Sequence, residues 1–209
     1  IPIKDKNILE QFELAHIWDC DKETGVWKKT SRLQSSVPPE ILFIERCTQF
    51  LAPGGRMGIV LPDSILGSPG LGYIREWMIQ NHRIVASIDL NADTFQPRNG
   101  TQTSVLILQK KTQEQRDAEE KSGKMADYNI FMAMVEKVGH DKRGNPLFKR
   151  DKEGNEILVP DTNSVLVLGE TGDGQRTVSH EQKVKVEDDQ TPDVPAIFAE
   201  WKKQEGLGW

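Results

Sequence analysis

Apolar runs of strand length alternate with helical patterns between residues 38 and 108, and this order most restricts the fold of the 209-residue chain. Met57–Leu61, Ile84–Leu90 and Thr103–Leu108 are short apolar runs bounded by polar or turn-forming residues, as is typical of buried strands. One helical pattern opens at Pro38-Pro39, before the first run, and another spans Tyr73–Ile79, before the second. Strands that alternate with helices in this way predict a layered α/β domain.

The segments on either side of this region are more polar. Residues 7–18 predict a short helix, residues 19–37 an irregular stretch and residues 112–127 a charged connector. Ile130–Val138 predicts a further strand, and two turns with the same Asp-Lys-x-Gly-Asn pattern, at 141–145 and 151–155, predict a β-meander. We therefore expect an α/β part at residues 1–127, a meander extension at 128–160, and a polar tail at 161–209 with a short helix near Ala196–Lys203.

Composition excludes some classes of protein. The formal net charge of −5 does not favour general nucleic-acid binding, so any attraction to DNA must come from local clusters or from residues outside this sequence. Cys20 and Cys47 have no partner at metal-binding spacing, and no apolar stretch reaches membrane-spanning length. The sequence predicts a cytoplasmic protein without structural disulfides.

Most residues that suggest chemistry have a simpler structural explanation. Gly67, Gly70 and Gly72 lie between a strand and a helix, but their spacing does not match a dinucleotide-binding fingerprint, and a mobile loop at the carboxyl edge of the sheet is favoured. The four histidines have no zinc spacing, so we expect no metal site. Glu45, Asp63 and Asp89 are not paired with a base or nucleophile, as a hydrolase would require.

The turn-rich segment 91–102 differs from these, because Phe95 lies in a polar turn between two strands. An aromatic side chain in a loop at the strand ends can stack on a flat ligand. The alternative is that Phe95 packs beneath its own loop, and the residues alone favour this packing role.

Several blocks in order resemble the modification subunit of type I restriction–modification systems, an adenine-N6 DNA methyltransferase. The blocks are Pro38–Cys47, Leu51–Asp63, Thr94–Pro97 and Gly100–Leu108, and Ala133–Asp141 is similar to the segment that follows in such subunits. Each block alone is weak, but the ordered set, which covers roughly residues 38–111, is specific.

The resemblance implies the C-terminal half of a Rossmann-like methyltransferase sheet, with its fifth, sixth and seventh strands, the last of them antiparallel to the rest. In the family, S-adenosylmethionine lies on a glycine-containing loop after the first strand. An Asn-Pro-Pro-aromatic motif after the fourth strand holds the flipped adenine. Neither motif occurs in this sequence. We therefore expect the catalytic motif upstream of Ile1 and no cofactor-binding residue in this chain.

One functional residue carries over from the family. Phe95 matches the aromatic residue that packs against the flipped adenine, and the resemblance reverses the preference for a packing role. Arg98, Asn99 and Thr101 flank it and are candidate DNA contacts. Pro62 and Asp63 match a block that borders the pocket, and no chemical role is expected for them.

The implied parent enzyme transfers a methyl group from S-adenosylmethionine to adenine N6 in DNA, and the isolated chain is expected to be inactive. Its implied partners are DNA and the specificity and restriction subunits of a type I system. The strand at Met57–Leu61 would expose an open edge, so we also expect self-association or complementation by another chain. Two alternatives remain: an α/β interaction module without catalysis, and a Rossmann-type methyltransferase that acts on RNA or protein.

Overall fold

A four-stranded sheet forms the centre of the computed structural model. The structure describes residues 1–168 and 175–209, and only the backbone of 163–168 and 175–180. Its strands lie in the order β3 (Arg56–Pro62), β5 (Thr103–Lys110), β4 (His82–Asp89) and β6 (Phe131–Met134). β5 is antiparallel to β3 and β4, whereas β4 and β6 are parallel. The predicted α/β class is confirmed. So is the prediction that the last of the three expected strands, β5, is antiparallel to the other two, β3 and β4.

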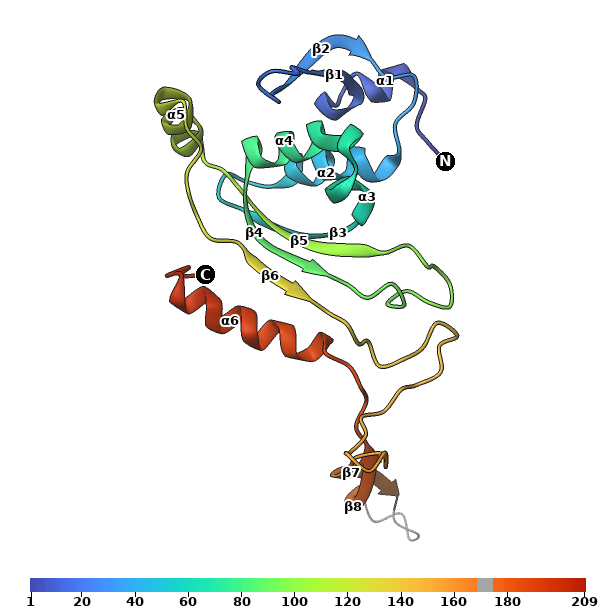
Figure 1. Ribbon diagram of the computed structural model, residues 1–209. Helices are drawn as coiled ribbons and strands as arrows, with labels where there is room; N and C mark the ends of the chain where they lie inside the picture. Colours follow the sequence, from blue (N-terminus) through green and yellow to red (C-terminus); the bar gives the residue numbers. More distant parts are fainter. Residues whose placement is uncertain (169–174) are drawn as a thin grey trace.

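Helices cover one face of this sheet (Figure 1). They are α2 (Pro39–Phe50), the short α3 (Asp63–Gly67) and α4 (Gly72–Asn81), with a 3₁₀ turn at Pro69–Leu71. The core between helices and sheet consists of side chains that are 6% exposed or less, among them Ile41, Ile44, Leu61, Ile74, Trp77, Met78, Leu106 and Leu108. The segment 63–72 is thus largely helical, and the prediction of a mobile glycine loop is wrong.

The strand predicted at Met57–Leu61 forms as β3, but it is less buried than the sequence predicts. Its side chains alternate between the helical face and the opposite face, and Val60 is 49% exposed. β3 pairs only with β5, so its outer edge has no partner strand among the described residues. A strand at the edge of a sheet is not surrounded in the way that a central parallel strand is.

The opposite face of the sheet receives the C-terminal helix. Gly58, Ile107, Ala86 and Phe131 are register partners across the four strands and therefore share this face. Phe131 contacts Phe198 and Trp201 of α6 (Val194–Gln204), with ring centroids 5.2 and 5.6 Å apart. The guanidinium of Arg56 on β3 lies 4.1 Å from the ring of Trp209, so the C-terminal residues reach across the sheet. The predicted terminal helix is confirmed, and it completes a three-layer arrangement (Figure 1).

The N-terminal region departs most from the sequence-based expectation. The helix α1 spans only Lys6–Leu9, and after a 3₁₀ turn at Glu13–Ala15 the chain forms an antiparallel hairpin of β1 (His16–Cys20) and β2 (Trp27–Leu33). Trp18 and Trp27 each lie 6.0 Å from the ring of Tyr73 on α4. The predictions of a helix over 7–18 and of an irregular segment over 19–37 are therefore wrong. Aromatic packing on α4 outweighs the local helical pattern.

Beyond the sheet, the charged connector forms α5 (Gln113–Ser122), which begins with a capping box at Thr112. β6 is shorter than the predicted strand Ile130–Val138. The two Asp-Lys-x-Gly-Asn turns close tight hairpins, with bridges His140–Pro146 and Arg150–Glu156. A long hairpin, β7 (Leu158–Leu168) and β8 (Gln175–Lys185), follows. The tail predicted over 161–209 is thus more regular than expected, although residues 169–174 lie outside the described part.

Within the described ranges, no helix has both the length and the apolar character needed to cross a membrane.

Candidate functional site

The loop between β4 and β5 stands at the edge of the sheet where β3 and β4 have their carboxyl ends (Figure 1). Hydrogen bonds fix both of its ends. The Leu90 N–H donates to the Thr103 carbonyl at 3.0 Å, and Asn91 Nδ2 donates to the Glu136 carbonyl at 2.6 Å. The Thr94 hydroxyl donates to the Asn91 carbonyl at 2.6 Å. The carboxyl edge is where open α/β sheets bind ligands, and here it carries a tethered loop.

Phe95 is 42% exposed on this loop and does not belong to the hydrophobic core. Its carbonyl accepts the N–H groups of Arg98 at 3.2 Å and Asn99 at 3.0 Å, so the loop turns tightly just after it. A ring with this exposure is accessible to a flat ligand. Stacking on an extruded base stays a prediction.

The three candidate DNA contacts, Arg98, Asn99 and Thr101, are exposed on the same loop. Asn99 Oδ1 accepts the Thr101 N–H at 3.0 Å, which uses the carbonyl side of its amide and leaves its NH₂ donors for other partners. Gly100 lies between them, and the Gln96 side chain packs close to it: a Cβ there would lie 2.7 Å from Gln96 Nε2. The loop therefore brings Phe95 and its three neighbours into one short, exposed turn.

The carboxylates at this edge connect the strands. Asp63 Oδ1 accepts the Ser104 hydroxyl at 2.8 Å, and the Asp63 N–H donates to the Gln102 carbonyl at 3.1 Å. Asp89 Oδ1 accepts Gln102 Nε2 at 3.3 Å. Asp63 therefore joins β3 to β5, and Asp89 joins β4 to the segment before β5.

The sequence did not reveal that the turn 141–145 packs against this loop. A Cβ built on Gly144 would lie 3.2 Å from Pro97 Cδ. A groove of about 370 Å³ runs between the two segments, lined by Gln96 and Pro97 on one side and by His140 and Pro146 on the other. The repeated turn pattern was visible in the sequence, but local patterns do not show which of two equal turns contacts a distant loop.

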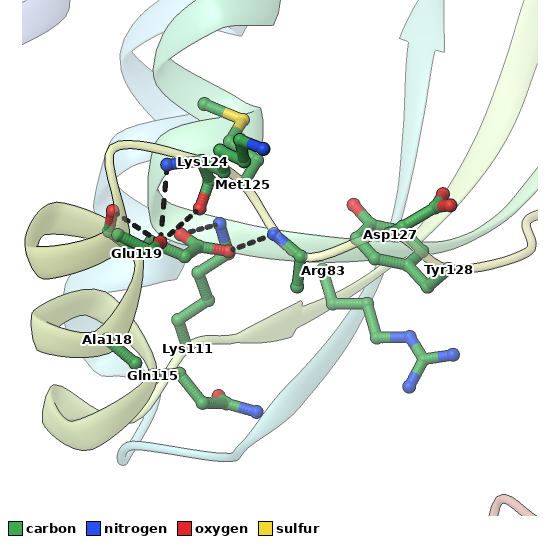
Figure 2. Close-up of a pocket in the computed structure, with 11 residues that line it drawn as sticks. Arg83, Lys111, Gln115, Ala118, Glu119, Lys124, Met125, Asp127 and Tyr128 are labelled. Atoms are coloured by element: carbon green, nitrogen blue, oxygen red, sulfur yellow. Dashed lines mark hydrogen bonds and ion pairs between the residues drawn. The ribbon is translucent and has the colours of Figure 1, made fainter.

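A second cavity, of about 510 Å³, lies at the opposite edge of the sheet, between α5 and the start of β4 (Figure 2). Two of its charged groups, Lys111 and Glu119, bind each other. The Lys111 ammonium pairs with Glu119 Oε2 at 2.6 Å and donates to the Ile79 carbonyl at 2.8 Å. Burial raises the pKa of Glu119, but hydrogen bonds from Lys111 and from the Ala126 N–H outweigh it, and the pKa falls below its usual range. These contacts hold the connector in place, so the carboxyl edge is the better candidate site.

The glycine-containing segment 67–72 does not fit a methyl donor. A Cβ on Gly72 would lie 2.8 Å from Trp27 Nε1, so Gly72 is required for close packing of the β1–β2 hairpin on α4. Gly67 is the last residue of α3, so it does not form a loop that could hold a ligand. In the described part of the chain we identify no pocket for S-adenosylmethionine at this segment.

The sheet has the order β3-β5-β4-β6, with β5 antiparallel to both of its neighbours and the Phe95 loop at the carboxyl edge. The family model for N-6 DNA methylase matches residues 14–155, more than half of the chain. The chain therefore belongs to the N-6 DNA methylase family.

Solved structures of related proteins are similar over part of their length. A protein from Listeria monocytogenes, assigned to the class I S-adenosylmethionine-dependent methyltransferases, is 19% identical with a TM-score of 0.44, over 64% of this chain and 33% of that one. The M protein of the type I restriction enzyme EcoKI is 24% identical with a TM-score of 0.35, over 41% and 18%. A modification subunit assigned to a type I restriction enzyme of Vibrio vulnificus is 15% identical with a TM-score of 0.38, over 73% and 26%.

The chain spans a third or less of the length of these three proteins. No curated protein sequence matches it. The family model, and not these partial likenesses, is the basis of the family assignment.

Proposed function

We propose that the chain is part of a DNA adenine-N6 methyltransferase, the modification subunit of a type I restriction–modification system, which transfers a methyl group from S-adenosylmethionine to a flipped adenine. The observation that carries this proposal is the exposed Phe95 ring on a tethered loop at the carboxyl edge of the sheet. Stacking of a base on an aromatic side chain contributes about 1–3 kcal/mol.

Phe95 holds the extruded base in this proposal and does not itself react. The 209 residues contain neither the Asn-Pro-Pro-aromatic motif nor the donor loop of the family, so other residues of the enzyme hold the donor and the adenine amino group. Arg98, Asn99 and Thr101 bind the DNA backbone beside the extruded nucleotide, and their exposure supports this role.

The outer side of β3 is the surface that joins the rest of the methyltransferase sheet. Val60 on β3 is 49% exposed, and Phe43 and Phe50 on the neighbouring helix α2 are 60% and 80% exposed. An open strand edge favours pairing with another strand, and exposed aromatic side chains on a helix favour packing against another element. The remaining sheet of the same enzyme fits this surface, with the specificity and restriction subunits as further partners of a cytoplasmic assembly.

Incubation of the intact enzyme with isotopically labelled S-adenosylmethionine and duplex DNA, followed by mass spectrometry of the nucleosides, tests this function. The expected product is labelled N6-methyladenine. RNA and a protein mixture serve as alternative acceptors, and label in either of them but not in DNA would contradict the proposal. The isolated chain should give no product, and methylation by it would refute its assignment as an incomplete catalytic part.

A further inference from the structure

The turns at 141–145 and 151–155 share one geometry. Asp141 Oδ1 accepts the N–H groups of Arg143 at 2.8 Å and Asn145 at 2.9 Å, and Asp151 Oδ1 accepts those of Glu153 at 3.0 Å and Asn155 at 2.8 Å. The glycines at the fourth position have φ values of +81° and +90°. Because each aspartate is bound to its own backbone, both turns are preorganised, and the chain carries two near-copies of one structure.

Their surroundings differ. A Cβ on Gly144 would meet Pro97 Cδ at 3.2 Å, whereas a Cβ on Gly154 would meet nothing within 4 Å. Arg98 follows Pro97 directly, and Arg143 precedes Gly144 directly. The first turn therefore adds its Lys142-Arg143 pair to the edge that already carries Arg98, and the second turn does not. In Figure 1 the segment after β6 runs beside the β4–β5 loop at this side of the sheet.

The charges near this edge fall into two groups. Some cations of the neighbouring segments are paired, such as Lys137 with Asp188 at 2.7 Å and Arg150 with Glu156 at 3.7 Å. Within the part of the chain that the structure describes, Arg98, Lys142 and Arg143 make no salt bridge, and all three are exposed. A phosphate is bound best by cations that have no carboxylate partner to give up.

Glu187 lines the groove between the loop and the turn. Its carboxylate makes the interior of the groove a poor place for a phosphate, and the tips of the two segments a better one. Asp141 adds a further negative charge, but its carboxylate accepts three hydrogen bonds within its own turn.

We propose that the turn 141–145 is a second DNA-backbone contact, in which Lys142 and Arg143 bind phosphates beside those bound by Arg98. The inference rests on the proposed function, since it places these phosphates next to the nucleotide that Phe95 stacks on. It assigns to the first turn a role that the second turn, with the same fold, does not have.

Equilibrium binding of the intact enzyme to duplex DNA at several salt concentrations tests this inference. The variant is Lys142→Ala/Arg143→Ala, and the matched control is Lys152→Ala in the distal turn. Each phosphate contact contributes about 0.9 to the slope of log K against log salt. The double variant should therefore lower that slope by about 2 and weaken binding at low salt about tenfold or more, while Lys152→Ala keeps the wild-type slope. The charge-preserving variant Lys142→Arg/Arg143→Lys should restore it.

A wild-type slope in the double variant, with wild-type melting temperature, would overturn the inference while adenine methylation by the same preparation still supports the proposed function. A reduced slope in an enzyme whose product is not N6-methyladenine would support the inference and contradict that function. A slope change seen only with RNA would overturn the inference, because the partner would then not be DNA.

Discussion

His82 is a fully buried histidine whose role is structural. Its Nδ1 faces the Met78 carbonyl at 3.1 Å and therefore carries the proton, and its Nε2 lies 3.0 Å from the Thr48 hydroxyl. Burial lowers the pKa of His82 to about 4, with a smaller contribution from Lys110 and Lys111. The neutral ring thus joins α2 to the start of β4.

This pKa predicts an acid-sensitive fold. Between about pH 6.5 and pH 4 the unfolded chain protonates His82 and the folded chain does not, so the free energy of unfolding falls as the pH falls through that range. The loss attributable to His82 is on the order of 2–3 kcal/mol. Urea unfolding of the wild type and of His82→Gln at several pH values measures it. The variant should show a shallower pH dependence, and parallel curves would contradict the assignment.

The candidate site was only partly predictable at the level of residues. Phe95 could be singled out because an aromatic residue in a polar turn is conspicuous in a sequence, but its exposure depends on how the whole loop is tethered to Glu136. The contact of Gly144 with Pro97 joins residues far apart in the chain, and no local pattern encodes it.

At the scale of elements, periodicity was a good guide where packing agrees with it. The helix from Pro39 and the strands β3, β4 and β5 appear close to their predicted positions. The β1–β2 hairpin does not follow the local pattern, because Trp18 and Trp27 gain their packing from Tyr73, which lies more than forty residues further along the chain.

A pair of glycine substitutions tests that packing. Gly72→Ala puts a methyl group 2.8 Å from the Trp27 indole and should lower the free energy of unfolding by about 1–3 kcal/mol, since the hairpin must shift away from α4. Gly67→Ala is the control, because a Cβ there meets nothing within 4 Å. Chemical denaturation gives both values. Equal stability of the two variants would show that the indole yields without cost.

At the scale of the whole molecule, the sheet has a covered face on each side and an open edge at β3. The sequence resemblance predicted such an edge, because it implied a sheet without its first four strands. The helical layer beneath the sheet was not predicted as a layer, since the contact of Trp209 with Arg56 joins the C-terminal residues to a distant strand.

The open edge predicts self-association of the isolated chain. Val60→Lys places a charge on the exposed edge strand and should shift the sedimenting species toward monomer. Ile197→Lys, at a position that is 59% exposed on α6, serves as a control that changes charge and hydrophobicity away from the edge. Analytical ultracentrifugation at several concentrations measures the shift. A wild-type chain that stays monomeric at high concentration would contradict the prediction.

The rate of methyl transfer in a single turnover of the intact enzyme, compared between wild type and Phe95→Ala, tests the role of the exposed aromatic ring most directly. Loss of about 1–3 kcal/mol of stacking predicts a rate roughly 5- to 150-fold slower, and Phe95→Trp should recover most of it. An alanine variant that transfers the methyl group at the wild-type rate would contradict the account. Phe95 would then have only a packing role within its own loop.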